Sequence, residues 1–398
     1  MIIRVLGVYL LLLVTSCNAT IPYLVSLKST ETIESFLNYD ILYPKSQQVK
    51  ALISNSFSFG NFTGFSGNFS KAVLDRLKRC PLVAEVTPDI ILKAFDVTTQ
   101  EDAPRHLARI SRKKKLKSGT YFEYRYNSKS QGKGVNAYVL DSGVQLKHPE
   151  FENRGKFGTD FTKEGSGDTN GHGTHVAGII GSKTYGVAKE VDIYEVKVLD
   201  KNGSGSLSTI ISAIEFVVNH RTRSGRPGVA NLSLGAYKNS VLNKAIDAAY
   251  NTGLVMVVAA GNSNINACLS SPAGAESALT VGAIDDYSDA LASFSNWGEC
   301  VDVFASGVYV QSLSPFFDEP QHLSGTSMAA PSVAGLVANL MSEGVPYSKV
   351  KSTLIEMSLK DKIPKSSLLL RRRTPNRIAY NGIEEYDSDS GSDSDDDD

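Results

Sequence analysis

Residues 135–143 read Val-Asn-Ala-Tyr-Val-Leu-Asp-Ser-Gly, a short apolar run that ends at a carboxylate and a Ser-Gly turn. The run has the length and composition of a buried strand. Further apolar runs alternate with helical patterns downstream. We expect strands at residues 191–199, 229–234, 254–260 and 279–284, and helices at residues 206–219, 241–251 and 327–342. This alternation predicts an α/β fold, with a parallel sheet and helices on both of its faces.

The composition is that of a globular protein, with 41% hydrophobic and 21% charged residues in a chain of 398. It excludes a fibrous or fully disordered chain. The net charge of −1 includes the contribution of an acidic tail, residues 384–398, which carries nine acids and no bases. The rest of the chain is modestly basic. Since this charge is spread out, apart from the run at residues 112–117, we expect no nucleic-acid partner.

The composition also divides the chain into regions. Residues 1–19 combine an early base with an apolar run and a small-residue end, which is typical of a signal peptide. We expect a small α+β unit at residues 20–97, a polar basic arm at 98–130, the α/β domain at 131–383 and a disordered acidic tail at 384–398. No later segment reaches the ~18 to 20 apolar residues of a membrane-spanning helix. These features predict a secretory-pathway protein without a transmembrane segment.

Three motifs carry groups that can act together in catalysis. Asp141 ends the first strand, and residues 170–178 place His172 and His175 at a glycine-rich helix start. Ser327 stands at the start of another helix. A serine hydroxyl becomes a good nucleophile when an imidazole takes its proton, and a buried carboxylate fixes the tautomer of that imidazole. Taken singly, the motifs are also compatible with a turn, a helix cap or a two-histidine metal face.

A family resemblance rests on these same motifs. They are Val139-Leu140-Asp141-Ser142-Gly143, Gly171-His172-Gly173-Thr174-His175-Val176-Ala177-Gly178 and Gly325-Thr326-Ser327-Met328-Ala329. They closely resemble the three signatures of the subtilisin-like serine proteases, in the fungal proteinase K and cerevisin branch. The resemblance implies a subtilisin-like three-layer fold preceded by a ferredoxin-like pro-segment. It also implies a triad of Asp141, His175 and Ser327, a structural role for His172, and Asn262 as the side-chain oxyanion donor.

The resemblance implies how a substrate binds as well. A peptide would lie as an added β-strand between Gly203-Ser204-Gly205 and Ser233-Leu234-Gly235. Leu207 would line a distal apolar pocket, and Ala259, Ala260 and Gly261 would line the primary one, which implies broad specificity. Residues 20–97 would serve as a folding chaperone and intramolecular inhibitor until autocleavage near Val97-Thr98.

Two further sites are implied by the resemblance. Cys268 pairs with Cys300 in a disulfide, although the residues alone leave two buried thiols as an alternative. A weak structural calcium ion would bind at Asp302, with carbonyl groups near Glu276 and Ala278, and no cofactor is required. Glycosylation sequons stand at Asn61, Asn68, Asn202 and Asn231, and we expect few glycans on the α/β domain.

These observations predict a serine endopeptidase, made as a zymogen, that hydrolyses polypeptides through an acyl-enzyme on Ser327. We expect a monomer, located in the vacuole, outside the cell or in the cell or spore wall. Its task is either broad protein turnover or limited processing of a few proteins, for example in spore or cell-wall assembly. The alternative from another class is a catalytically silent scaffold with the same fold, and loss of a triad residue or of Asn262 would be its signature.

Overall fold

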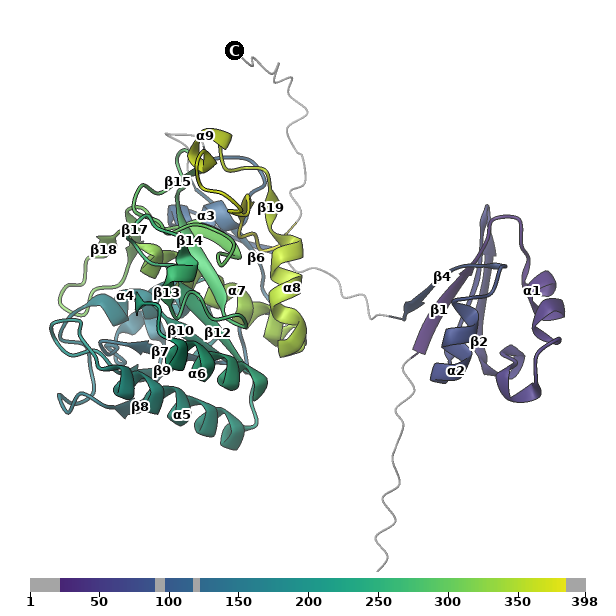
Figure 1. Cartoon of the computed structure of the whole chain (residues 1–398), viewed down its shortest axis with the longest axis horizontal. Helices are drawn as coiled ribbons and strands as arrows, with labels where there is room; N and C mark the ends of the chain where they lie inside the picture. Colours follow the sequence, from purple (N-terminus) through teal and green to yellow (C-terminus); the bar gives the residue numbers. More distant parts are fainter. Residues whose placement is uncertain (1–21, 90–96, 117–121, 384–398) are drawn as a thin grey trace, which may run out of the picture. The chain divides into compact units, whose positions relative to one another are not determined.

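The computed structural model describes residues 22–89, 97–116 and 122–383 of the chain (Figure 1). The predicted signal peptide at residues 1–19 and the predicted acidic tail at residues 384–398 lie outside the described residues. The chain divides into two compact units, Met1–Ala94 and Phe95–Asp398.

The described part of the first unit is a four-stranded antiparallel sheet packed against helices, in the strand order β2-β3-β1-β4. Its elements are β1 (Pro22–Leu27), α1 (Ile33–Asp40), β2 (Ile53–Phe59), β3 (Phe62–Asn68), α2 (Lys71–Leu77) and β4 (Val83–Pro88). Thr32 begins α1 by accepting a hydrogen bond from the backbone N–H of Ser35. A buried ion pair of 2.6 Å between Asp40 and Arg76 ties α1 to α2. The small α+β unit predicted at the N-terminus is confirmed.

The second unit is built on a mostly parallel sheet. In sheet order its strands are β19 (Leu359–Lys360), β20 (Arg377–Ile378), β16 (Val303–Ser306), β14 (Leu279–Asp285), β12 (Leu254–Ala259), β10 (Gly228–Leu232), β7 (Asn136–Asp141), β9 (Asp192–Lys197) and β8 (Gly155–Asp160). The pairings from β16 through β8 are all parallel, whereas β19 pairs with β20 antiparallel. The parallel sheet predicted from the alternating pattern is therefore confirmed.

Helices cover both faces of this sheet (Figure 1). They are α4 (His172–Gly181), α7 (Thr326–Ser342) and α8 (Tyr347–Met357) on one face, and α5 (Leu207–Ser224) and α6 (Ser240–Asn251) on the other. Strand β7 shows why two cores form, since Ala137 and Val139 pack toward α4 and α7 while Tyr138 and Leu140 pack toward α5 and α6. The expected three-layer α/β architecture is present.

The ends of the helices follow from local chemistry. Ser206 caps α5 by accepting a hydrogen bond from the backbone N–H of Thr209. The helix runs beyond its predicted end and stops at Gly225, whose φ of 65° is a left-handed conformation that glycine adopts without strain. The helix predicted from Ser327 begins one residue earlier, at Thr326.

Shorter elements complete the described second unit. They are β5 (Val97–Gln100), α3 (Arg105–Ile110), β6 (Tyr124–Asn127), β11 (Ala236–Tyr237), β13 (Ser270–Ser271), β15 (Ala290–Leu291), β17 (Val310–Ser312), β18 (Gln321–Leu323) and α9 (Lys365–Leu368), with 3₁₀ turns at Pro149–Phe151 and Ala267–Leu269. In the first unit, 3₁₀ turns lie at Lys45–Gln47 and Lys50–Leu52. No helix among the described residues is long and apolar enough to cross a membrane.

Candidate active site

Asp141 ends β7 at the carboxyl edge of the sheet and is fully buried. Its Oδ1 lies 2.7 Å from Nδ1 of His172 and accepts a second hydrogen bond, of 2.8 Å, from the backbone N–H of Ser142. A ring nitrogen that faces a carboxylate carries the proton. Asp141 therefore fixes the tautomer of His172, and Nε2 is the nitrogen that can accept a proton.

The buried carboxylate of Asp168 holds the first turn of α4 in place beside β7. One of its oxygens accepts the hydroxyl of Ser142 at 2.9 Å, and the other accepts both the backbone N–H and the hydroxyl of Thr174, at 2.8 and 2.7 Å. Gly173 allows the close approach, because a Cβ there would collide with the carbonyl oxygen of Gly143. These contacts bring His172, the first residue of α4, to Asp141.

The imidazole of His172 keeps 27% of its side chain exposed, whereas the side chain of Asp141 is inaccessible to solvent. Burial disfavours the charged imidazolium, but the Asp141 carboxylate outweighs burial through its charge and its hydrogen bond. The pKa of His172 is accordingly raised above its ordinary value of 6.5. The position suits a base that becomes an imidazolium during reaction.

His175 is not the triad histidine, so the sequence prediction was wrong on this point. It is fully buried one turn further along α4, and its Nε2 lies 3.1 and 3.0 Å from the carbonyl oxygens of Val310 and Gln321. A nitrogen between two carbonyls must donate, so Nε2 carries a proton and its hydrogen bonds fix α4 to β17 and β18. Burial lowers the pKa of His175 to about 4. The structural role assigned to His172 belongs to His175.

Ser327 lies in the first turn of α7. Its hydroxyl donates to the carbonyl oxygen of Ser233 at 3.2 Å, and the hydroxyl of Ser233 donates to the carbonyl oxygen of Ser327 at 2.9 Å. This reciprocal pair joins the start of α7 to the segment that follows β10. Backbone N–H groups in the first turn of a helix lack intrahelical partners, so this position favours negative charge.

Asn262 follows β12 and shares a cavity with Ser327. Its Oδ1 accepts the backbone N–H and the hydroxyl of Thr326, at 2.8 and 2.9 Å. The hydroxyl of Thr326 also accepts the backbone N–H of Gly261 at 3.1 Å. With Oδ1 occupied in this way, the Nδ2 group of Asn262 is the part of the amide that can donate to a ligand.

A second asparagine holds the segment that carries Asn262. Nδ2 of Asn296 donates to the carbonyl oxygen of Ala260 at 2.8 Å, and its Oδ1 accepts the backbone N–H groups of Ser263 and Ile265 at 3.1 and 3.0 Å. Sequence reasoning had not assigned Asn296 or Thr326 a role in the site. Asn296 stands in the stretch Phe-Ser-Asn-Trp-Gly at residues 294–298, which is the local signal that could have pointed to it.

Two adjoining cavities, of about 450 and 470 Å³, form a cleft beside these residues. Ser327 and Asn262 line the first cavity, and His172 lines the second. Both cavities share the walls formed by residues 233–235. The residues expected to bind substrate all line one or both of them: Gly203, Ser204, Gly205, Leu207, Ser233, Leu234, Gly235, Ala259, Ala260 and Gly261. Ser327, His172 and the expected substrate residues therefore face one connected cleft.

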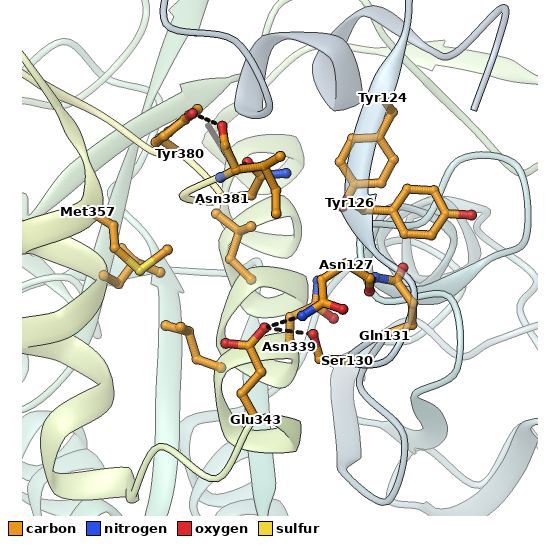
Figure 2. Close-up of a pocket in the computed structure, with 14 residues that line it drawn as sticks. Tyr124, Tyr126, Asn127, Ser130, Gln131, Asn339, Glu343, Met357, Tyr380 and Asn381 are labelled. Carbon is orange, nitrogen blue, oxygen red and sulfur yellow. Dashed lines mark hydrogen bonds between the residues drawn. The ribbon is translucent and has the colours of Figure 1, made fainter. Parts of the chain in front are cut away.

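Another, much smaller cavity lies between β6 and α7 (Figure 2). At its edge Glu343 accepts hydrogen bonds from the hydroxyl of Ser130 at 2.6 Å and from the amide of Asn127 at 3.4 Å. Its volume of about 30 Å³ holds little more than one water molecule. Asp141, His172 and Ser327 are not among the residues that line it.

The chain matches the Subtilase family over residues 132–380. It belongs to the subtilase family. Residues 23–95 match a second family, Peptidase inhibitor I9, which gives this subtilase an N-terminal inhibitor domain. The predicted family is confirmed, and the protein is a serine endopeptidase, a hydrolase of the subtilisin type.

Named relatives agree with this assignment. The subtilase is 43% identical over 377 residues to the subtilase-type proteinase RRT12 of Saccharomyces cerevisiae, covering 84% of this chain and 77% of the relative. It is 40% identical over 359 residues to cerevisin of the same yeast, covering 83% of this chain and 55% of cerevisin. Its fold matches the crystal structure of a cold adapted subtilisin-like serine proteinase with a TM-score of 0.65 and 39% identity, covering 71% of this chain and all of that one.

The disulfide implied by the resemblance is present in the subtilase. Cys268 and Cys300 are joined, with their Cα atoms 5.3 Å apart. The bond links the 3₁₀ turn Ala267–Leu269 to the segment after Trp297, next to a backbone hydrogen bond of 2.8 Å from Ala267 to Trp297. Among the described residues Cys80, buried in the first unit, is the free thiol.

The calcium site expected at Asp302 is not available in this subtilase. The ammonium of Lys351 lies 3.0 Å from Oδ2 of Asp302 and donates to the carbonyl oxygens of Glu276 and Ala278, at 3.3 and 2.6 Å. These are the oxygens that were expected to bind the ion. Because a fixed cation already sits among them, the residues present do not fit calcium.

Proposed function

We propose that this subtilase cleaves peptide bonds with Asp141, His172 and Ser327 as its catalytic triad. The observation that carries the proposal is the 2.7 Å contact between Oδ1 of Asp141 and Nδ1 of His172. It supports an imidazole that is oriented, held in one tautomer and stabilised when it gains a proton. The cleft shared by His172 and Ser327 supports a base that reaches the nucleophile.

The reaction then follows from the chemistry of these groups. The hydroxyl of Ser327 leaves the carbonyl of Ser233, gives its proton to Nε2 of His172 and attacks the carbonyl carbon of the substrate. Negative charge that develops on the substrate oxygen is stabilised by the amide of Asn262 and the backbone N–H of Ser327. The imidazolium protonates the amine as the peptide C–N bond breaks, and the acyl group stays bound to Ser327 as an ester. A water molecule, deprotonated by His172, hydrolyses this ester and restores the enzyme.

The substrate is an extended polypeptide that pairs with the backbone at residues 203–205 and 233–235. Backbone pairing depends little on the side chains of the substrate. The cavity beside Ser327 is lined by alanine and glycine residues. Both features support broad specificity. Limited processing of a few proteins is the narrower alternative. A survey of cleavage products separates the two, because turnover yields many products and processing yields a few defined cuts.

We also propose that the protein is made as a zymogen. The I9 inhibitor domain supports a pro-segment at residues 20–97 that inhibits the catalytic domain within the same chain until it is cut near Val97-Thr98. Residues 98–130 would then be the N-terminal arm of a monomeric catalytic domain, residues 131–383. The predicted signal peptide supports entry into the secretory pathway, and we propose the vacuole, the exterior or the wall as the destination.

Labelling with a biotinylated fluorophosphonate, which reacts with activated serines, tests the proposal. We expect a labelled species whose intact mass corresponds to a chain that starts near residue 98. The Ser327→Ala variant should take no label. A shortened chain that takes no label would contradict the active-enzyme proposal and favour the silent scaffold. A full-length chain that takes no label would contradict autocleavage and indicate activation by another protease.

A further inference from the structure

Lys351 extends from α8 and places its ammonium among three oxygens that lie far from it in sequence. They are the carbonyl oxygens of Ala278 and Glu276, at 2.6 and 3.3 Å, and the carboxylate oxygen of Asp302, at 3.0 Å. The side chains of Lys351 and Asp302 are only 27% and 16% exposed. An ammonium has three protons to donate, so its hydrogen-bonding capacity is matched to these acceptors.

The same oxygens cannot hold calcium while Lys351 is present. Calcium takes six to eight oxygen ligands at about 2.3–2.6 Å, and an ion at that distance from the three oxygens would lie in contact with the lysine nitrogen. The two cations would repel each other at close range in a partly buried place. The single positive charge of Lys351 already balances the single negative charge of Asp302.

We propose that Lys351 is a built-in replacement for a calcium ion in this subtilase. The cation is tethered to the chain, so this site keeps its charge balance in the presence of chelators or where calcium is scarce. The proposal does not depend on the catalytic triad.

The tethered cation stabilises the region behind the substrate cavity. Oδ2 of Asp302 also accepts the backbone N–H of Thr280 at 2.9 Å, and the hydroxyl of Thr280 donates to the carbonyl oxygen of Ala273 at 2.9 Å. Ala273 lines the cavity that contains Ser327. A continuous chain of contacts therefore leads from Lys351 to the wall of the cleft, and loss of the cation should loosen that wall.

The test uses the full chain with Ser327→Ala, which prevents self-digestion, as the parent. Lys351→Met removes the charge and keeps most of the side-chain length. Lys349→Met on the exposed side of α8 is the matched control. Thermal unfolding is followed in EDTA, in 10 mM calcium chloride and in 10 mM magnesium chloride.

In EDTA we expect Lys351→Met to lower the unfolding midpoint by about 5 °C or more, because Asp302 loses its partner. Calcium should then recover at least half of this loss in Lys351→Met, since the vacated oxygens can bind a weakly held ion. Magnesium should not restore the unfolding midpoint of Lys351→Met, because it requires shorter bonds in octahedral geometry. Addition of Asp302→Asn should abolish the recovery. The control should stay within about 1 °C of the parent in every buffer.

Two results would overturn the proposal. One is an equal response of the parent and Lys351→Met to calcium, and the other is a midpoint of Lys351→Met in EDTA that equals that of the Lys349→Met control. If Lys351→Met does not fold in any buffer, the double variant Lys351→Met with Asp302→Asn tests the proposal by whether it folds. Recovery of folded protein supports charge compensation by Lys351, and failure to recover it contradicts that role.

Discussion

Two histidines of α4 have opposite environments although only three positions separate them. His172 meets the carboxylate of Asp141 at the edge of the cleft, and its pKa is raised. His175 lies among backbone carbonyls in the core, and burial lowers its pKa to about 4. The same side chain is thus placed to act as a base at one position, and it is a packing and hydrogen-bonding group at the other. The two rings differ in their hydrogen-bond partners, a carboxylate for His172 and backbone carbonyls for His175. The position of each ring along α4 relative to the sheet edge determines which partner it meets.

The largest expected effect is that of His172→Ala. Without a base, the hydroxyl of Ser327 keeps its proton, and kcat should fall by about 10⁶-fold, a magnitude known from subtilisin, a member of the same family. Because this variant cannot cleave its own pro-segment, the segment is cut near Val97-Thr98 by an added protease that is then removed. Turnover of a chromogenic peptide, normalised to folded protein, measures the loss. His175→Gln is the matched control, and an equal loss of kcat in folded protein of both variants would refute the distinction between the two histidines.

Asp141→Asn should lower kcat by about 10⁴-fold, because an amide no longer selects the Nδ1–H tautomer of His172. It should also move the pH profile. The base works when neutral, so activity of the parent falls as the pH drops through the raised pKa of His172, above 6.5. In the variant, burial lowers the pKa of His172 and only the smaller effect of the Asp168 carboxylate opposes it, so the acid limb should shift to lower pH. A profile of kcat/KM between pH 4 and 9 tests this, and an unmoved acid limb would contradict the assignment.

Asn262→Ala should have a smaller effect, a fall in kcat of about 10²- to 10³-fold with KM little changed. The donor acts on charge that exists only in the transition state, so ground-state binding should not suffer. The loss of the hydrogen bonds to Thr326 could also disturb the start of α7. Asn262→Asp, which keeps an acceptor for Thr326 but places a negative charge at the oxyanion, is the control. Restoration of kcat by aspartate would contradict the oxyanion role.

Much of this site could be predicted because strand ends and glycine-rich segments have local signatures. Asp141 and Asn262 each follow an apolar run, and the carboxyl ends of parallel strands meet at one edge of a sheet. The cleft residues, including the glycines at residues 203, 205 and 235, were expected only because of the family resemblance. They lie together in the structure.

The choice between His172 and His175 could not be made from spacing, because both belong to one motif. A physical argument was available, since the first residue of a helix that starts at the sheet edge lies nearer to a strand-end carboxylate than one a turn later. Lys351 had no such signal. It belongs to no motif, and only the packing of α8 brings its ammonium to Asp302. A cation supplied from a distant helix is set by tertiary structure alone.

The smallest catalytic effect is expected for His175→Gln, with kcat within about tenfold of the parent, whereas stability should change in a pH-dependent way. At pH 7 the loss of the bonds to Val310 and Gln321 should cost about 1–3 kcal/mol. Between pH 6.5 and 4 the unfolded state binds a proton at His175 that the folded state refuses, so the parent loses stability as the pH falls. Without this histidine, the drop in unfolding free energy from pH 7 to pH 5 should shrink by about 2 kcal/mol. Urea unfolding at both pH values in the Ser327→Ala background measures the difference, and an unchanged drop would show that His175 can be charged in the folded core.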